Sequence, residues 1–413
     1  MIFCKESAPE GDSIAGKEGA GKLLKASSLW DISRTFLLLG ATAYGGLAMV
    51  EPIRRRIVQE KGWLSQKEFL DGLALCQLLP GATVVQLATY VGYHLRHTKG
   101  ALAAAAAFIL PAFVLMLGLS FLYFRYGDLT WVKAVSQGLG AVVIALLLQA
   151  LWRFQEIIRR HWLDLGIAVL TLGALWTGIH YLLVFMGAGL LRLALGWKWS
   201  PLAVSTEQPS SGSAPSLGLW LTQVCGALAI LTLLFWGLWN WQHQLGVMSL
   251  IFLKIGVVAF GGGYAMIPIL QWDMVDHLGW LTLRQFLDGI LLGFVTPGPI
   301  IITATFIGYW IKGLLGALVA TVSIFLPPIL LIVFLTPFYQ RVKEGQWVRQ
   351  VIQGILAALV GMLVLVVIQM GRASLVDWKS LAILVGAVAA LIPFKENLLW
   401  VAAAAACLSL FIY

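Results

Sequence analysis

Charge is scarce in this chain of 413 residues: Asp, Glu, Lys and Arg together make up 11% of it. Hydrophobic residues make up 60%, and the mean hydropathy is +0.88. A soluble protein of this length cannot bury so much apolar surface, so the composition predicts that a lipid bilayer surrounds it. Four uncharged runs each reach the roughly 20 residues that a helix needs to cross a bilayer; they are 101–124, 217–242, 313–340 and 350–371.

Other absences narrow the function. The sequence has no Walker-type phosphate loop, no nucleotide fingerprint and no nucleophile triad, so we expect neither an enzyme nor a bound cofactor. An ion gradient is then the expected energy source, not ATP hydrolysis. The cysteines lack the spacing of metal ligands, so no metal site is predicted; they are Cys4, Cys76, Cys225 and Cys407. The net charge of +9 is typical of basic cytoplasmic loops in a membrane protein, and no nucleic-acid partner is expected.

The chain contains two copies of one hydrophobic unit. The run FLLLGATAYGG at 36–46 returns as FLKIGVVAFGG at 252–262. Phe252 follows Phe36 by 216 positions, and Pro297 follows Pro80 by 217, so the two copies align with almost no shift. Two hydrophobic units in one chain, each interrupted at the same place by Pro-Gly, are typical of secondary transporters.

We divide the chain into four parts. Residues 1–28 are polar and lack the apolar core of a signal peptide, so they are expected to form a disordered tail. The first repeat is 29–197, a polar linker and an extra transmembrane helix occupy 198–246, and the second repeat is 247–413. The predicted fold is an all-α polytopic membrane protein with two homologous six-segment halves, broken helices at Pro-Gly and one linker helix. The first helix of each repeat, about 31–53 and 247–270, is expected to end in a proline, Pro52 or Pro268.

Two short apolar segments flank each Pro-Gly, 66–79 and 82–95 in the first repeat and 283–296 and 299–312 in the second. Fourteen helical residues span about 21 Å, which is too short for a hydrocarbon core of about 30 Å. Each pair therefore either crosses once as a broken helix or enters and returns as a hairpin. If every other helix crosses once, broken crossings give 13 crossings and inverted halves, whereas hairpins give 11 crossings and parallel halves.

Loop charge favours inverted halves. The stretch 52–69 carries five basic residues against two acidic ones, Glu60 and Glu68, whereas the matching stretch 269–285 carries one basic residue, Arg284, against Asp273 and Asp276. Basic loops stay on the cytoplasmic side of a membrane, so equivalent loops of opposite charge indicate opposite sides.

The segments Leu79–Ala82 and Thr296–Pro299 carry the two breaks. A helix that begins after such a break directs its free N–H groups and the positive end of its dipole into the membrane. Unpaired backbone groups there are costly, so they need a ligand, and an anion is the natural one. The alternative is a break satisfied only by packing against neighbouring helices.

Neutral polar side chains and flexible glycines surround both breaks, and they suit a tetrahedral oxyanion. The substrate-binding candidates are Gly45, Gly46, Pro80, Gly81, Thr83, Gln86, Gly261, Gly262, Pro297, Gly298, Pro299, Thr303 and Thr305. A simpler explanation remains open for each kind of residue. Threonine hydroxyls also bond their own helix backbone, and glycines also serve helix packing.

Asp71 and Asp288 are equivalent carboxylates within apolar segments, each in the sequence Phe-Leu-Asp-Gly. An acid in a membrane is costly unless it is paired or wet, so both are candidates for proton coupling. The alternative is an acid that favours the N-terminal turn of a helix at the interface. Lys254, also within an apolar segment, has no counterpart in the first copy.

Three motifs of the second half carry a resemblance: Phe260 to Pro268 (FGGGYAMIP), Gly279-Trp280-Leu281, and Pro297-Gly298-Pro299 followed by Gly308-Tyr309. With its doubled pattern, the chain resembles the chromate ion transporter family in its long two-domain form, over about 36–412. The first half departs from the family pattern at Leu47 and Ala82.

The resemblance implies a multi-pass protein of the plasma (inner) membrane that exports chromate, with sulfate as competitor, and so confers chromate resistance. The membrane potential or a proton gradient would drive export, and the halves would have opposite orientation. A carrier of sulfate or another anion, or an anion channel, are the rival functions. A homodimer is left open as a partner arrangement.

Overall fold

The computed structural model describes residues 28–42, 49–126, 129–159, 161–196, 217–259, 263–338, 346–375, 377–392 and 398–413. Most of the expected tail and linker, and the glycine pairs Gly45-Gly46 and Gly261-Gly262, lie outside the described residues. Within the described ranges the regular elements are all helices. The prediction of an all-α fold is confirmed.

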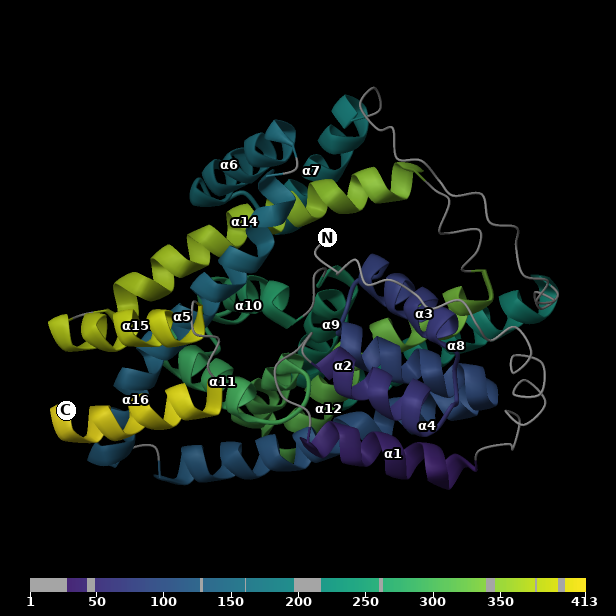
Figure 1. Cartoon of the computed structure of the whole chain (residues 1–413), viewed down its shortest axis with the longest axis horizontal. Coiled ribbons are helices and arrows are strands. Elements are labelled where there is room, and N and C mark those ends of the chain that lie inside the picture. Colours follow the sequence, from purple (N-terminus) through teal and green to yellow (C-terminus); the bar gives the residue numbers. More distant parts are fainter. Residues whose placement is uncertain are drawn as a thin grey trace, which may run out of the picture.

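The first half runs from the N-terminus to the polar linker, in the purple to blue part of Figure 1. Its elements are α1 (Leu29–Thr42), α2 (Val50–Arg54), the π-helix η2 (Arg55–Glu60), α3 (Gln66–Leu78), α4 (Thr83–Tyr126), α5 (Thr130–Arg159), α6 (Trp162–Trp176) and α7 (Tyr181–Gly196). The linker helix is α8 (Leu217–Trp241).

The second half repeats this order. Its elements are α9 (His243–Val258), α10 (Gly263–Gln271), the π-helix η3 (Trp272–His277), α11 (Leu283–Val295), the 3₁₀ turn η4 (Ile300–Ile302), α12 (Thr303–Leu335), η5 (Thr336–Phe338), α14 (Gln346–Ser374), α15 (Trp378–Leu391) and α16 (Leu398–Ile412). Four long helices of the described chain are apolar enough to cross a membrane; they lie in α4, α5, η4–α12 and α14.

The prolines of the first helices do not end them as expected. Pro52 is the third residue of α2, and Pro268 lies inside α10. A proline is tolerated in the first turn of a helix because its missing N–H would have no partner there.

The short segments around each Pro-Gly form a hairpin. Gly72 of α3 lies against the ring of Tyr90 in α4, and the Tyr90 hydroxyl donates to the Glu68 carbonyl at 3.3 Å. In a continuous crossing, residues 18 positions apart would lie far from each other, so α3 and the start of α4 run side by side in opposite directions. Gly289 lies against Phe306 in the same way. Both halves therefore contain the re-entrant arrangement.

Local sequence explains where each hairpin begins and turns. Ser65 and Glu68 form a capping box at the start of α3, and Thr282 and Gln285 form the equivalent box at the start of α11. Such boxes satisfy backbone N–H groups that have no partner within the helix. The Pro-Gly breaks then end α3 and α11, because proline cannot continue the helical ladder.

In each half, the chain then turns back a second time. Gly92 packs against the Gly100 carbonyl, and Gly308 packs against the Gly316 carbonyl, so the backbone on either side of the turn is in contact. The turn of α4 falls at Arg96 and His97, where the dihedral angles leave the helical region. The elements α4 and α12 therefore each consist of two antiparallel helices, about 83–95 and 98–126 in α4.

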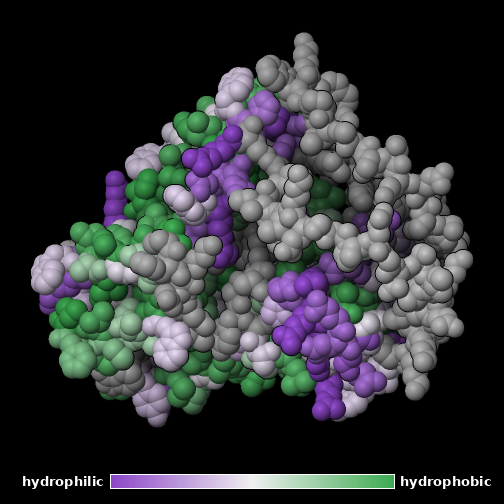
Figure 2. Space-filling view, in the orientation of Figure 1, coloured by the Kyte–Doolittle hydropathy of each residue, from purple (hydrophilic) through white to green (hydrophobic). Residues whose placement is uncertain are grey.

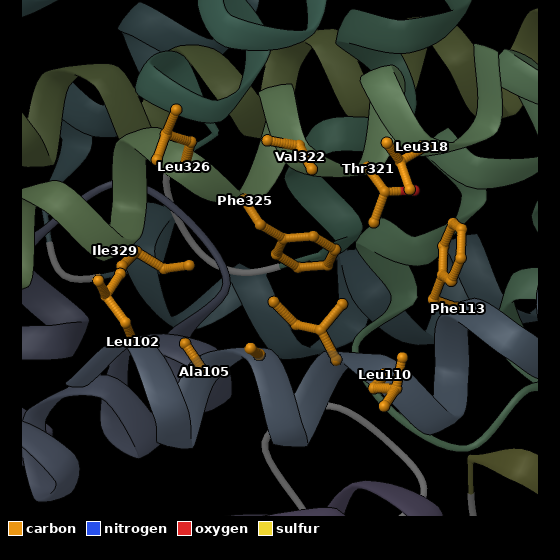
Figure 3. A pocket seen from close by; sticks show the side chains of 12 residues that line it. Leu102, Ala105, Leu110, Phe113, Leu318, Thr321, Val322, Phe325, Leu326 and Ile329 are labelled. Atoms are coloured by element: carbon orange, nitrogen blue, oxygen red, sulfur yellow. The ribbon is translucent and has the colours of Figure 1, made fainter. Parts of the chain in front are cut away.

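The long second parts of α4 and α12 cross on an approximate two-fold axis. A groove of about 350 Å³ between them is lined by six residues from each half, and every one has its equivalent 216 positions away on the other side. Leu102 lies beside Ile329 at one end of this groove and Phe113 beside Leu318 at the other (Figure 3). The equivalent helices therefore run antiparallel, which agrees with inverted halves.

Hairpins and inverted halves thus occur together. The count of membrane crossings had instead predicted that hairpins would go with parallel halves. That count assumed that every helix outside the hairpin crosses once. Helix α6 has only 15 residues, below the roughly 20 that a full crossing needs. A single full crossing by every helix outside the hairpin therefore does not follow, and the number of crossings stays a prediction.

The two halves are interwoven and share one hydrophobic core. Helices α6 and α7 pack on α14 of the second half, while α15 and α16 pack on α5 of the first half (Figure 1). Large apolar side chains are exposed on the outside, among them Trp162, Trp236 and Phe411, as a lipid-facing surface requires. Figure 2 shows hydrophilic residues gathered over α2 and α3 and a mostly hydrophobic surface over α15 and α16.

The second turn gives a test of backbone strain. His97 has φ 48° and ψ −142°, and its equivalent Gly313 has φ 59° and ψ −144°. Only glycine adopts this conformation without strain. We expect His97→Gly to raise the free energy of unfolding by about 1 kcal/mol and Gly313→Ala to lower it by about the same amount.

Thermal melting of the purified protein in detergent measures both changes. No atom lies within 4 Å of a Cβ built at Gly313, so the loss there would come from strain and not from a clash. Equal melting temperatures for the wild type and both variants would contradict the strained turn.

Candidate functional site

The Pro-Gly break of the first half lies against the second half. Gly81 has φ +125°, and a Cβ built there would overlap the ring of Pro328 in α12. The Gly81 N–H donates to the carbonyl of Ala259, at the end of α9, at 2.7 Å. A glycine is therefore required at this position for its φ angle and for the close approach of the two halves.

The second break docks in the equivalent way. Gly298 has φ +112°, and a Cβ built there would lie 2.8 Å from Cβ of Ala112 in α4 and 3.9 Å from the Gly40 carbonyl oxygen. Ala112 and Pro328 are 216 positions apart, so the two contacts are related by the internal symmetry. Each break thus rests on the long helix of the other half.

The helices that follow the breaks begin inside the protein. Helix α4 starts at Thr83, directly after Pro80-Gly81-Ala82, and the turn η4 starts at Ile300 after Pro299. The first turn of a helix has N–H groups without partners in that helix, and it carries the positive end of the dipole. Thr83 and Ile300 are both buried, so these ends lie out of bulk water.

Gln86 is fully buried one turn into α4. Its side-chain nitrogen donates to the Pro80 carbonyl at 2.7 Å and so holds the break in place. Its side-chain oxygen is buried and has no hydrogen-bond partner among the described residues. Of the candidate side chains, Gln86 therefore combines a contact with the break and a polar atom without a protein partner.

The threonines of the second half use their hydroxyl groups within the protein. The Thr303 hydroxyl donates to the Ile300 carbonyl at 2.9 Å, and the Thr305 hydroxyl shares a 2.7 Å hydrogen bond with Thr321. Thr321 in turn donates to the Ala317 carbonyl at 2.7 Å. Thr303 therefore bonds a backbone carbonyl, which is the simpler explanation that the sequence left open. The hydroxyls of Thr303 and Thr305 both have partners within the protein.

The two equivalent carboxylates differ in environment. Asp288 of α11 is 5% exposed, and the Tyr123 hydroxyl of α4 donates to its Oδ2 atom at 2.6 Å. Asp71 of α3 is only partly buried. A buried, hydrogen-bonded acid is the stronger candidate for proton coupling, because its protonation changes the charge inside the protein.

Comparison with known proteins now decides the family. The family described as Chromate transporter matches residues 30–193 and again 247–410. The chain belongs to the chromate transporter family. The doubled match follows the two halves of the structure, and it agrees with the resemblance drawn from the motifs.

Relatives of similar length support this assignment. A probable chromate transport protein of Synechococcus elongatus is 31% identical over 350 residues, 84% of this chain and 86% of that protein. A chromate transport protein of Cupriavidus metallidurans is 32% identical over 340 residues, 82% and 81% of the two chains. An uncharacterized transporter of Methanocaldococcus jannaschii is 31% identical over 346 residues, 83% and 84%. No solved structure matches. The protein is a multi-pass membrane protein of a transporter family.

A partly buried charge network, which sequence analysis missed, joins the halves of this chromate transporter family member. Lys254 of α9 pairs with Asp273 of η3 at 2.9 Å, and the hydroxyl of Tyr181 in α7 donates to the same carboxylate at 3.0 Å. The isolated Lys254 in an apolar segment was the signal for it. Asp273 is 2% exposed, so it is not the loop acid that the charge comparison assumed.

A second buried ion pair was also missed. Arg192 of α7 donates to Asp164 of α6 at 2.7 Å and to Gln353 of α14 in the other half at 3.3 Å. The exposed fractions of the Arg192 and Asp164 side chains are 4% and 0%. In the second half, Ser380 and Ser409 occupy the equivalent places, since Ser409 meets Gly138 as Arg192 meets Gly354.

The Arg192–Asp164 pair gives a stability test. Arg192→Met leaves a buried carboxylate without its partner, so we expect the free energy of unfolding to fall by about 3 kcal/mol. Replacing both residues by serine, as in the second half, removes both charges and is expected to recover most of that loss. Unfolding of the purified protein in mixed detergents measures both variants. A double variant that is less stable than Arg192→Met would contradict this account.

Proposed function

We propose that this protein is a secondary active transporter that exports chromate across the plasma (inner) membrane and so confers chromate resistance. The proton gradient or the membrane potential would drive it. The relatives named as chromate transport proteins support the substrate. The observation that carries the mechanism is the pair of symmetric Pro-Gly breaks at Gly81 and Gly298, each docked on the other half.

In this proposal the backbone N–H groups that follow Pro80-Gly81 and Pro297-Gly298 bind the oxyanion. They point from helix N-termini, where the dipole favours negative charge. Gln86 supports this end of the site, because its buried amide bonds Pro80 and has a free oxygen for a proton of the substrate or of water. The hydroxyl of Thr83 would donate a further hydrogen bond to the oxyanion. The hydroxyls of Thr303 and Thr305 bond protein groups here, so they would have to exchange those bonds to contact it.

The docking of each break explains how transport would follow from binding. The breaks touch Pro328 and Ala112, which are equivalent positions on antiparallel helices. Inverted halves alternate between two orientations by moving one half against the other around a fixed site. A site formed at these contacts would therefore open to one side of the membrane and then to the other.

Transport is tested with everted membrane vesicles from cells that express this chain. We expect energy-dependent accumulation of chromate that an uncoupler abolishes and that sulfate, a tetrahedral dianion of similar shape, inhibits. Vesicles from cells with an empty vector serve as the control. Sulfate accumulation without chromate accumulation would assign the protein to another anion, and flux that neither saturates nor needs a gradient would indicate a channel.

Substitution at the breaks tests the site. We expect Gly81→Leu combined with Gly298→Leu to abolish transport, because both glycines have positive φ and face the other half closely. Membrane insertion, measured by the amount of folded protein in the membrane, should persist. Gly178→Leu is the matched control, since Gly178 has φ +86° but no atom lies within 4 Å of a Cβ built there. Full transport by the double variant would contradict the proposed site.

A further inference from the structure

A small polar cavity lies between α5 of the first half and α11 and α14 of the second. Its volume is about 140 Å³, whereas one ordered water needs roughly 15 Å³. The polar side chains in its wall are Ser136, Gln137, Arg284, Asp288 and Ser374. The cavity can therefore hold several waters or one small polar ligand, and it lies apart from the two Pro-Gly breaks.

Its polar groups are only partly satisfied by the protein. The Tyr123 hydroxyl donates a hydrogen bond to the Asp288 carboxylate. The Ser136 hydroxyl also bonds this carboxylate, and the positive charge of Arg284 interacts with it. Ser374, 9% exposed, has a buried hydroxyl without a hydrogen-bond partner among the described residues. A buried hydroxyl without a hydrogen-bond partner lowers the stability of the fold. Because this hydroxyl borders a cavity, it indicates a ligand or an ordered water in that space.

The internal repeat shows how the wall of this cavity differs from the equivalent positions of the other copy. The polar frame is shared by both copies: Arg284 corresponds to Lys67, Asp288 to Asp71 and Gln137 to Gln353. The small residues of the wall are not shared, because large aliphatic residues replace them in the other copy: Ser136 by Ile352, Gly140 by Leu356 and Ser374 by Ile158. Small and hydroxyl-bearing residues therefore line this cavity, whereas aliphatic side chains occupy the equivalent positions of the other copy.

We propose that this cavity binds a tetrahedral oxyanion together with a proton on Asp288. Arg284, the two serine hydroxyls and the Gln137 amide are hydrogen-bond donors, and guanidinium groups are strong partners of oxyanions. Among the described neighbours, the charged or titratable groups that face Asp288 are Tyr123 from α4 and Arg284 from α11. The identity of the anion as chromate rests on the proposed function.

The charges explain why proton and anion bind together. When Asp288 is ionised, its negative charge cancels that of Arg284 and repels an anion. When a proton from solvent occupies the carboxyl, the repulsion is removed, and the guanidinium of Arg284, an exposed residue in the cavity wall, attracts the anion. The bound anion in turn stabilises the protonated acid, because linkage between two ligands is reciprocal. Binding should therefore tighten as the pH falls. Because the proton and the anion would leave together, this site favours the membrane potential over the proton gradient as the driving force for export.

Equilibrium binding of chromate, and separately of sulfate, to the purified full-length protein tests this site. We expect tighter binding at acidic than at alkaline pH for the wild type. Arg284→Gln should weaken binding at least about tenfold, the effect of losing one hydrogen bond to a charged group. Ser374→Ile, which installs the residue of the other copy, should abolish the pH-dependent part of the binding and leave any binding at the Pro-Gly breaks. Asp288→Asn should bind at alkaline pH as the wild type does at acidic pH and lose the pH dependence.

Matched controls keep the test specific. Lys67→Gln removes the equivalent cation of the filled copy, so its binding should equal that of the wild type. Arg284→Lys should recover part of the affinity lost in Arg284→Gln, and melting temperatures exclude variants that fail to fold. Unchanged affinity in both Arg284→Gln and Ser374→Ile would overturn the cavity as the binding site.

The outcomes separate this inference from the proposed function. Chromate binding that survives every cavity variant but is lost with Gly81→Leu and Gly298→Leu would overturn the inference and leave the proposed function standing. Sulfate binding that depends on Arg284, without chromate binding, would support the inference and overturn chromate as the substrate. A wild-type protein that binds neither anion would overturn both.

Discussion

The hydrogen bond from the Gly81 N–H to the Ala259 carbonyl, 2.7 Å long, shows the constraint on which the rest of this structure depends. A backbone group inside a bilayer needs a partner, because lipid offers none. A break in a helix is therefore possible only where another part of the protein lies close. Here the other half supplies that part, since it accepts the Gly81 N–H and packs against Gly298.

The duplicated sequence makes this exchange reciprocal. Gly40 lets α1 approach the Phe108 carbonyl of α4, and Gly256 lets α9 approach the Ile324 carbonyl of α12 in the same way. The long helices held by these contacts then run antiparallel beside each other (Figure 3). Both equivalent sets of contacts are present together, so the two-fold relation between the halves extends from the groove to the two breaks. Re-entrant breaks and inverted repeats thus belong to one design.

Sequence reasoning predicted the elements whose signals are local. Apolar runs predict the all-α fold and reveal the duplication, and Pro-Gly predicts the breaks. A carboxylate within an apolar segment pointed to Asp288. Length could not distinguish a broken crossing from a hairpin, since both need the same short segments. The partners of Lys254 and Arg192 were missed, because Asp273 and Asp164 lie 19 and 28 residues away and only the packing of three helices brings them together. Thr303 matches the alternative that the sequence left open, because its hydroxyl donates to a backbone carbonyl, that of Ile300.

Divergence between the copies separates the two roles that a transporter needs. The first half has the buried pair Arg192–Asp164, where the second has Ser409 and Ser380. The polar cavity beside Asp288 lies between the halves, and large aliphatic residues stand at the positions equivalent to its small wall residues. A buried ion pair fixes geometry at a cost in desolvation, whereas a polar cavity lowers the cost of bringing in a charged ligand. The ion pair therefore anchors α6 and α7 to α14, and in the inference above the cavity is where an anion and a proton would bind.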